Sequence, residues 1–369
     1  MKTAGEVDVC ATSLLFKEQP LKRKYIPILI VIMIALLVTA CGGPKKNRYE
    51  AQFLVLFDTA TTVIGFAETE ENFSEMANLV YDELKIYHQL YDIYNDYDGI
   101  NNIKTINENA GIAPVVVDKK IIELIRFSEE AYEKTDGQVN IAFGSVLKIW
   151  HDYRELGIDD PLGAKLPTME ELQKAALHTD IKGIIIDEAA STVFLPDPDM
   201  RLDVGGIAKG YAVERVSDTL VEEGYLDFLI SVGGNVRASG LRGDDRSMWK
   251  VGIQNPDIDS GKGDLFTASL TDLSLVTSGD YIRYYTVNGE RYHHIIDPET
   301  LMPARYFAAV TIITEDSGMA DALSTAVFNL PFEEGVDLVE SFESTEALWV
   351  FHDGTQKESQ GFKKMIGIQ

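Results

Sequence analysis

The stretch with the clearest chemical potential is DVGGIAKGYA, which runs from Asp203 to Ala212. A Gly-Gly turn that opens a helix lets backbone N–H groups approach a phosphate closely, and Lys209, one helical turn further on, can neutralise the phosphate charge. The spacing matches neither a Walker loop nor a G-x-G-x-x-G loop. From this stretch alone, a phosphate site and an ordinary turn before a helix both stay open.

Asp321 and Thr325 stand four positions apart in a small, apolar segment with helical character. Residues at i and i+4 share one helix face, so the carboxylate and the hydroxyl converge. Both are hard oxygen ligands that suit Mg²⁺. The alternative is that Asp321 is a cap or a partner of the helix dipole near the helix start.

The segment YHHIIDP, residues 292–298, places two imidazoles at the end of a predicted strand. His293 and His294 point to opposite faces if the strand persists, so at most one reaches a given site. A purely structural histidine is the alternative. The chain contains no G-x-S-x-G, no H-E-x-x-H and no zinc-type Cys/His cluster, which excludes the hydrolase classes that depend on them.

The elements that must position these residues interleave without a strict β-α-β repeat, which predicts an α+β or mixed α/β fold rather than a doubly wound sheet. A strand pair is predicted within 49–67, broken at 58–60, and a loop over 95–109. Further strands are predicted at 183–186, 192–195, 228–232, 247–253, 266–270, 281–287, 307–313 and 347–352. Helices are predicted at 73–94, 118–135, 168–177, 208–223, 318–329 and 333–342. Because the sequence shows no repeats or linkers, we expect a single catalytic unit built as two lobes.

Charge and cysteine content narrow the function further. The 369 residues include 33 basic and 59 acidic side chains, a formal charge of −26. So negative a surface repels phosphate backbones, which argues against nucleic acid as a partner. Two cysteines, Cys10 and Cys41, cannot build a disulfide framework or a cysteine metal site in the folded body.

The N-terminal region has the pattern of an export signal. Residues 25–40 are uncharged and follow Lys22, Arg23 and Lys24. The run is shorter than the roughly 20 apolar residues that span a membrane. Residues 37–41, LVTAC, resemble a bacterial lipobox, in which the cysteine is diacylated after cleavage.

This pattern predicts a signal peptide over 1–40, a lipidated tether over 41–48 with the lipid on Cys41, and a catalytic domain over 49–369. The product would be a lipoprotein anchored to the bacterial membrane and facing outward. An uncleaved N-terminal anchor is the alternative. Acidic residues within 1–20 do not fit a leader, so translation could start near Leu21.

Five motifs occur in the same order as in the flavin transferase (ApbE) family, which this chain resembles over roughly residues 50–350. They are D-x-G-G-I-A-K-G-Y-A (203–212), S-V-G-G-N (231–235), S-G-D-Y (278–281), H-I-I-D-P (294–298) and D-A-x-x-T (321–325). Phe57-Asp-Thr59, Asp136-Gly137 and Trp150 extend the likeness. The resemblance implies an exported, often lipid-anchored, Mg²⁺-dependent FAD:protein FMN transferase.

The same resemblance implies roles for individual residues. The family's contacts to FAD correspond to Gln138, Val139, Asn140, Asp203, Lys209 and Ile295. Its metal ligands correspond to the backbone carbonyl of Gly206 and the side chains of Asp321 and Thr325. The motifs depart from the family where Val139-Asn140 stands for Phe-Asp, where Leu301 stands for a glycine and where Ser324 stands for an acidic residue. We therefore expect a differently built turn at Leu301 and a weaker metal site.

Together these features predict an enzyme that takes FAD and esterifies FMN onto a Ser or Thr hydroxyl of another extracytoplasmic protein, with release of AMP. His294 is the candidate proton acceptor because an imidazole titrates near neutral pH, and Asp297 could orient it. Two alternatives stay open: a FAD pyrophosphatase, in which water replaces the acceptor hydroxyl, and a flavin-binding lipoprotein without turnover.

Overall fold

The computed structural model describes residues 46–368, which fall within one compact unit. The predicted signal peptide over 1–40 and the predicted lipidation site at Cys41 lie outside the described residues. Among the described residues, no helix has the length and apolar character needed to cross a membrane. The first strand begins at Asn47, two residues earlier than the predicted domain start.

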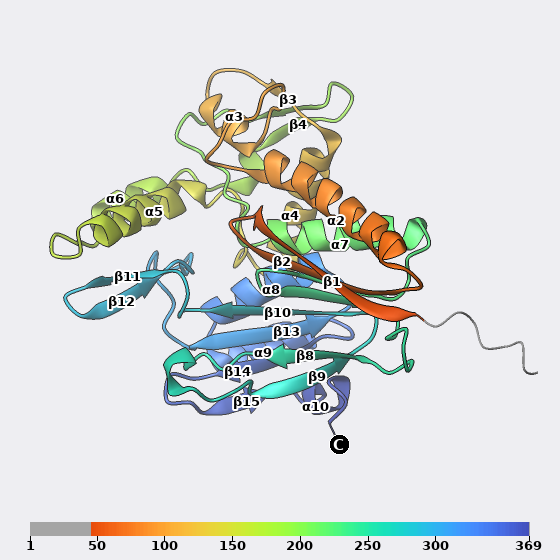
Figure 1. Ribbon diagram of the computed structural model, residues 1–369. Coiled ribbons are helices and arrows are strands. Elements are labelled where there is room, and N and C mark those ends of the chain that lie inside the picture. Colours follow the sequence, from red (N-terminus) through yellow and green to blue (C-terminus); the bar gives the residue numbers. More distant parts are fainter. Residues whose placement is uncertain (1–45, 369) are drawn as a thin grey trace, which may run out of the picture. The chain divides into compact units, whose positions relative to one another are not determined.

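An eight-stranded sheet forms the centre of the unit (Figure 1). In their order across the sheet, its strands are β1 (Asn47–Leu56), β2 (Thr59–Ala67), β6 (Phe228–Val232), β7 (Asn235–Ser239), β10 (Leu273–Gly279), β13 (Ala309–Thr314), β14 (Glu346–Val350) and β15 (Gln356–Glu358). Every neighbouring pair is antiparallel. Helices precede, interrupt and follow these strands, so the mixed α+β prediction is confirmed.

The remaining elements surround this sheet. The helices are α2 (Glu70–Tyr91), α3 (Ile103–Glu108), α4 (Lys119–Lys134), α5 (Gly144–Asp159), α6 (Met169–Ala176), α7 (Ala208–Glu222), α8 (Ser317–Asn329), α9 (Phe332–Glu340) and α10 (Phe362–Met365), with 3₁₀ turns at Ile181–Gly183 and Ile258–Ser260. Three small sheets hold the other strands: β3 (Val115–Val116) with β5 (Thr192–Phe194) and β4 (Ile185–Asp187), β8 (Trp249–Ile253) with β9 (Phe266–Leu270), and β11 (Tyr284–Val287) with β12 (Glu290–His293).

Hydrophobic cores cover both faces of the large sheet, as the alternation along β13 shows. Val310 and Ile312 join the core with the helices, in which α8 packs on β10 and β13. Ala309 and Ile313 belong to the opposite core, shared with the β8–β9 hairpin and α10. Successive strand residues point to opposite faces, so a strand buried on both sides is apolar throughout.

A third core joins α5 and α6 to the β11–β12 hairpin, and Figure 1 shows these elements projecting together from one end of the sheet. Trp150 of α5 anchors it, since its indole stacks on Tyr292 and donates a hydrogen bond to the carbonyl of Leu301 at 3.0 Å. Sequence periodicity did not predict α5. It begins at a glycine without a side-chain cap, so the usual start signal is missing.

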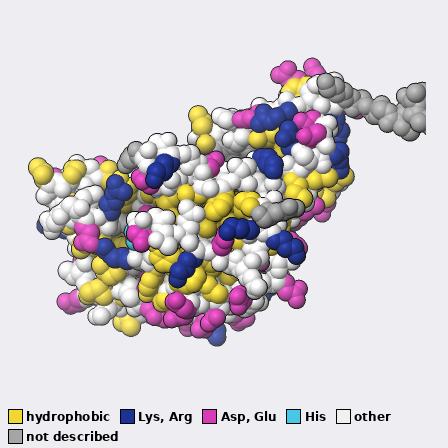
Figure 2. Space-filling view, turned by 90° about the horizontal axis from the view of Figure 1, so that it is seen from below, with side chains coloured by type: hydrophobic (Ala, Val, Ile, Leu, Met, Phe, Trp, Pro, Cys, Tyr) yellow, Lys and Arg dark blue, Asp and Glu magenta, His cyan; other side chains and the backbone are white. Residues whose placement is uncertain are grey.

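One other prediction of local structure was wrong, because the expected loop over 95–109 contains α3, whose capping box joins Asn102 and Thr105. The strand predicted at 228–232 ends before Gly233-Gly234, as β6 does. The sequence did not predict β7, which follows in a hairpin whose turn is formed by these two glycines, both with the positive φ that such a turn requires. Figure 2 shows that acidic side chains gather along one edge of the drawn face, while lysines and arginines lie in small separate groups.

Candidate active site

All ten predicted site residues line one cavity of about 400 Å³. They come from the loop before α5, the start of α7, the end of β12 and one face of α8. The residues are Gln138, Val139, Asn140, Asp203, Gly206, Lys209, His294, Ile295, Asp321 and Thr325. Segments separated by almost 190 positions in the sequence therefore meet at one cavity, as the prediction of a single site requires.

The glycine motif forms the turn that enters α7. Asp203 holds this turn, because its carboxylate accepts a hydrogen bond from the Gly205 amide at 2.9 Å. Burial raises the pKa of Asp203, whereas His151, Lys209 and Arg154 lower it. The helix then starts at Ala208 without a side-chain cap. The start of a helix carries partial positive charge and uncapped amides, which is the arrangement that binds a phosphate oxygen.

Asp321 lies where α7 and α8 cross and is only 5% exposed. Its Oδ2 accepts a hydrogen bond from the Gly210 amide at 2.9 Å and lies 3.9 Å from Lys209 Nζ. The two helices approach so closely that a Cβ on Gly210 would lie 2.2 Å from the Ser317 carbonyl oxygen. Burial raises the pKa of Asp321, and Lys209 and the Gly210 amide counter this effect.

The donor set at this crossing fits a divalent cation. A Cβ built on Gly206 would lie 3.5 Å from Thr325 Oγ1, so the turn and α8 are neighbours. A carboxylate, a hydroxyl and a backbone carbonyl are hard oxygen ligands of the kind that Mg²⁺ prefers. The cap of α8 is Asp316, whose carboxylate accepts from the Met319 amide at 2.7 Å. Asp321 is therefore not needed as a cap.

Ser324, which stands where some members of the family have an acidic residue, is buried, and its hydroxyl is hydrogen-bonded to the hydroxyl of Ser278. Its Oγ donates to the Asp321 carbonyl at 2.9 Å and lies 2.8 Å from Ser278 Oγ. Since Ser324 has one proton, Ser278 must donate to it and can only accept on its cavity side. The position thus offers neutral oxygens instead of a second carboxylate.

His294 is held by the backbone of Arg283. Its Nδ1 lies 3.2 Å from the Arg283 carbonyl oxygen, which also accepts from the His294 amide at 3.1 Å. A carbonyl can only accept, so Nδ1 carries the proton and Nε2 has a lone pair. Burial, followed by the charges of Arg283, His293, Arg154 and Lys209, lowers the pKa of His294 to about 3. The side chain is neutral at neutral pH.

Asp297 does not orient His294, contrary to the expectation from the sequence. Its carboxylate instead accepts from the Glu299 amide at 2.8 Å and from Thr300 Oγ1 at 2.9 Å. These bonds build the turn that ends at Leu301, which has φ = 61°. This is the left-handed region that glycine adopts without strain, so Leu301 occupies it at a cost of roughly 1–3 kcal/mol.

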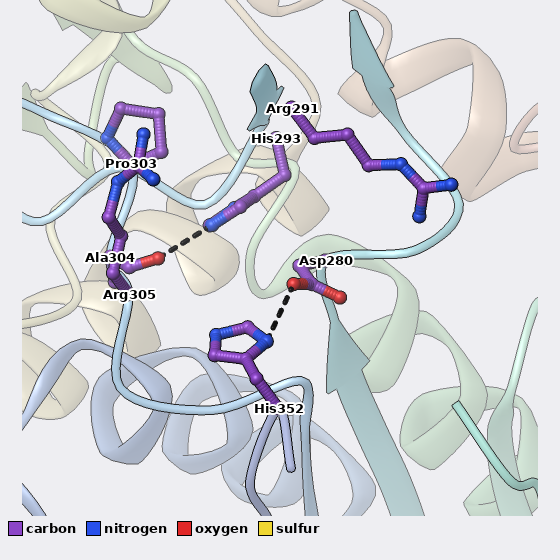
Figure 3. Close-up of a pocket in the computed structure, with 7 residues that line it drawn as sticks. All are labelled: Asp280, Arg291, His293, Pro303, Ala304, Arg305 and His352. Carbon is purple, nitrogen blue, oxygen red and sulfur yellow. Dashed lines mark hydrogen bonds and ion pairs between the residues drawn. The ribbon is translucent and has the colours of Figure 1, made fainter. Parts of the chain in front are cut away.

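His293 faces away from this cavity into a second one of about 250 Å³ (Figure 3). Its Nε2 donates to the Ala304 carbonyl at 2.7 Å and its Nδ1 accepts from the Ile295 amide at 3.2 Å. Across the same cavity His352 lies 3.5 Å from Asp280. The two histidines of the motif thus divide between two cavities, as strand alternation predicts, and His293 has a structural role.

His293 should make acid destabilise the protein. Burial lowers its pKa in the folded chain to about 4, against an ordinary value of 6.5. Between pH 6.5 and 4, His293 is protonated in the unfolded chain but not in the folded chain. The free energy of unfolding therefore falls as the pH drops from 6.5 towards 4. We expect His293→Gln to be less stable than the parent at pH 7, and the difference to shrink by about 2 kcal/mol at pH 5. Urea unfolding of both proteins at each pH measures this; parallel losses would show that His293 does not titrate in this way.

Asn140 uses both ends of its side-chain amide within the protein. Its Nδ2 donates to the Thr179 carbonyl and its Oδ1 accepts from the Ala142 amide, each at 2.8 Å. The Asp203 amide in turn donates to the Ile141 carbonyl at 2.8 Å. The segment predicted to contact FAD is therefore fixed against the glycine turn.

Sequence reasoning missed several residues that line the cavity. Tyr94 lies 52% exposed with its ring 5.0 Å from that of His151. Arg154 and Arg283 add two cations. Asn329 also lines the cavity and was not predicted. Its Oδ1, like Oε1 of the predicted Gln138 and Oδ1 of Asn235 in the S-V-G-G-N motif, is buried and has no hydrogen-bond partner among the described residues. The spacing of Phe143, Leu147, Trp150 and Arg154 along α5 was the available signal, because it is that of one helix face.

Another potential group of metal ligands, His178, Asp197 and Asp199, lies outside the cavity. His178 Nδ1 is 2.7 Å from Asp197 Oδ2, which is a hydrogen-bond distance, and the side chain of Asp199 is 70% exposed. These contacts describe a hydrogen-bonded pair near the surface. The candidate metal ligands at the cavity therefore remain Gly206, Asp321 and Thr325.

Comparison with known proteins agrees with this fold. A family model described as the ApbE family matches residues 57–349. A protein of Treponema pallidum named FAD:protein FMN transferase is 31% identical, over 92% of this chain and 94% of that protein. One of Klebsiella pneumoniae with the same name is 32% identical, over 71% and 80%. The crystal structure of the ApbE protein of Thermotoga maritima has a TM-score of 0.75 at 29% identity, over 87% of this chain and 99% of that one.

These findings define the protein first as a transferase with a mixed α+β fold. More specifically, the chain belongs to the ApbE family.

Proposed function

We propose that this chain is a Mg²⁺-dependent FAD:protein FMN transferase that acts on extracytoplasmic proteins. A Ser or Thr hydroxyl oxygen of the acceptor forms a new bond to the flavin-side phosphorus of FAD. The bond from that phosphorus to the bridging oxygen breaks, and its electron pair leaves with AMP. The acceptor therefore carries FMN as a phosphate ester. The observation that supports this best is the convergence of Lys209, Asp321, Thr325 and His294 on one cavity.

Positioning and charge neutralisation dominate phosphoryl transfer. Asp321, Thr325 and the Gly206 carbonyl would hold Mg²⁺, which when bound polarises a phosphoryl oxygen as a Lewis acid. Lys209 and the start of α7 offset the phosphate charge. The orphaned oxygens of Gln138, Asn235 and Asn329 can accept hydrogen bonds from polar N–H or O–H groups of the nucleotide.

His294 supplies the proton acceptor, although it does not titrate near neutral pH as expected from the sequence. Its pKa of about 3 makes it a weak base in the free protein, and the negative charge of a bound pyrophosphate would raise that pKa, because an anion nearby favours the imidazolium. With Nδ1–H donated to Arg283, the lone pair on Nε2 can take the proton of the attacking hydroxyl. The same lone pair could activate water, which is why a FAD pyrophosphatase is the rival reaction. Incubation of the purified chain with FAD and Mg²⁺, with and without an acceptor protein, distinguishes the transferase reaction from the pyrophosphatase reaction. A transferase releases AMP faster when an acceptor is present and leaves little free FMN, whereas a pyrophosphatase releases equal amounts of AMP and free FMN without one.

We also propose that the enzyme is held at the outer side of the bacterial membrane through a diacylated Cys41, because the LVTAC segment resembles a lipobox. Two acyl chains anchor a protein stably, whereas one binds only marginally. Cys41→Ala should therefore abolish incorporation of labelled fatty acid and move the protein out of the membrane fraction. Cys10→Ala is the matched control and should change neither. Lipid labelling that persists in Cys41→Ala would exclude Cys41 as the attachment site.

A further inference from the structure

Two arginines reach the reaction cavity from different elements. Arg154 comes from the last part of α5, and Arg283 precedes β11. Burial lowers the pKa of Arg154, and the charge of Arg283 lowers it further. Both arginines also lower the pKa of His294. Arg154, Arg283 and His294 therefore lie close together at the cavity, although they come from three parts of the chain.

Neither arginine forms an ion pair with an acidic side chain within residues 46–368. The guanidinium of Arg154 instead lies 2.7 Å from His151 Nδ1. Other arginines of the described chain, such as Arg126 and Arg246, do pair with carboxylates. Asp203 and Glu155 raise the pKa of Arg154, yet neither carboxylate lies close enough to pair with it. Like charges that converge without a paired anion are unfavourable, particularly where one of them is partly removed from water. An anionic ligand would relieve this repulsion.

Lys209 alone cannot neutralise the charge of a dianionic ligand in the cavity. Its Nζ donates to the Gly205 carbonyl at 3.1 Å and lies 3.9 Å from the Asp321 carboxylate, so part of its charge is already used within the protein. The chain as a whole carries −26, which repels anions at a distance. A dianionic ligand therefore needs further cations inside the cavity.

We propose that Arg154 and Arg283 together bind the pyrophosphate of FAD, an inference that rests on the proposed function. The pyrophosphate offers non-bridging oxygens on both phosphorus atoms, and a guanidinium fork can bond two of them at once. The backbone carbonyl of Arg283 holds His294, while the side chain of Arg283 binds the phosphate. Pyrophosphate and proton acceptor are thereby positioned by one residue.

Binding of two flavins tests this directly, because riboflavin has the ring of FAD without any phosphate. Fluorescence titration should show that Arg154→Gln and Arg283→Gln each raise the Kd for FAD at least about tenfold, the scale of losing a hydrogen bond to a charged group. The Kd for riboflavin should stay within about twofold of the parent. Arg126→Gln, whose side chain pairs with Glu129 on the surface, is the matched control and should change neither value. Arg154→Lys should recover part of the FAD affinity, because it restores the charge without the fork.

Equal losses for FAD and riboflavin would overturn the proposal, since the arginines would then support the ring or the fold. Unchanged FAD affinity would overturn it too. If both variants bound FAD as the parent does but required more acceptor protein, the pair would belong to acceptor recognition instead. A parent that binds FAD tightly yet modifies no protein would contradict the proposed function alone and leave the arginine assignment standing.

Discussion

Replacing Asp321 with asparagine is expected to lower the rate of FMN transfer by at least about 10²-fold, the scale of losing a principal electrostatic stabiliser. The change removes the only side-chain anion assigned to Mg²⁺. The amide oxygen can still accept the hydrogen bond from Gly210, so the packing of α7 on α8 should survive. Single-turnover assays over a range of Mg²⁺ concentrations, together with a thermal melt, measure both effects.

Asp316→Asn is the matched control for this variant. Asp316 lies in the cap position of the same helix and does not line the cavity. An asparagine caps almost as well as an aspartate, so this variant should transfer FMN at nearly the parent rate. Parent-like turnover by Asp321→Asn with Mg²⁺ present would remove Asp321 from the metal site.

Replacing His294 with alanine should separate binding from catalysis. If His294 accepts the proton of the incoming hydroxyl, the chemical step should slow by roughly 10²–10⁴-fold while FAD affinity stays nearly intact. Within residues 46–368 the side chain of His294 makes one hydrogen bond, to the Arg283 carbonyl, so the fold should tolerate its loss. Titration of flavin fluorescence beside a single-turnover assay gives the two quantities separately.

Lys209→Ala provides the contrast, because its charge acts in the ground state and in the transition state alike. This variant should lose FAD affinity as well as turnover. If His294→Ala lost FAD binding while Lys209→Ala kept it, the assignment of roles would be reversed. Normal turnover by both would place neither residue at the scissile phosphate.

The fold could be predicted from the sequence where one element carries its own signal. The period of the segment at Glu70–Tyr91 predicted α2, and the apolar run at Phe228–Val232 predicted β6. α5 was missed because Gly144 opens it without a cap and its apolar residues are divided between a core and the cavity, which left only the spacing of its cavity face as a signal. Because α5 was not predicted, Arg154 was not recognised as a residue of the cavity.

The candidate site could be predicted from the sequence because its motifs have recognisable spacing, either at an element boundary, as in the turn before α7, or on one face of a helix, as for Asp321 and Thr325 in α8. What no motif could reveal was which partner each side chain uses. Asp297 lies three residues from His294, yet it builds its own turn, and a carbonyl from Arg283 holds the imidazole instead. Such pairings depend on how β11 and β12 meet in space.

The most direct test of the transferase assignment uses proteins from a strain in which the gene for this chain has been deleted. Exported and membrane proteins of that strain would be incubated with the purified chain, FAD and Mg²⁺, and their tryptic peptides analysed by mass spectrometry. Our account predicts a Ser or Thr peptide that carries one FMN as a phosphate ester, formed by the parent and not by Asp321→Asn. Release of AMP and free FMN with no modified peptide in that mixture would contradict it.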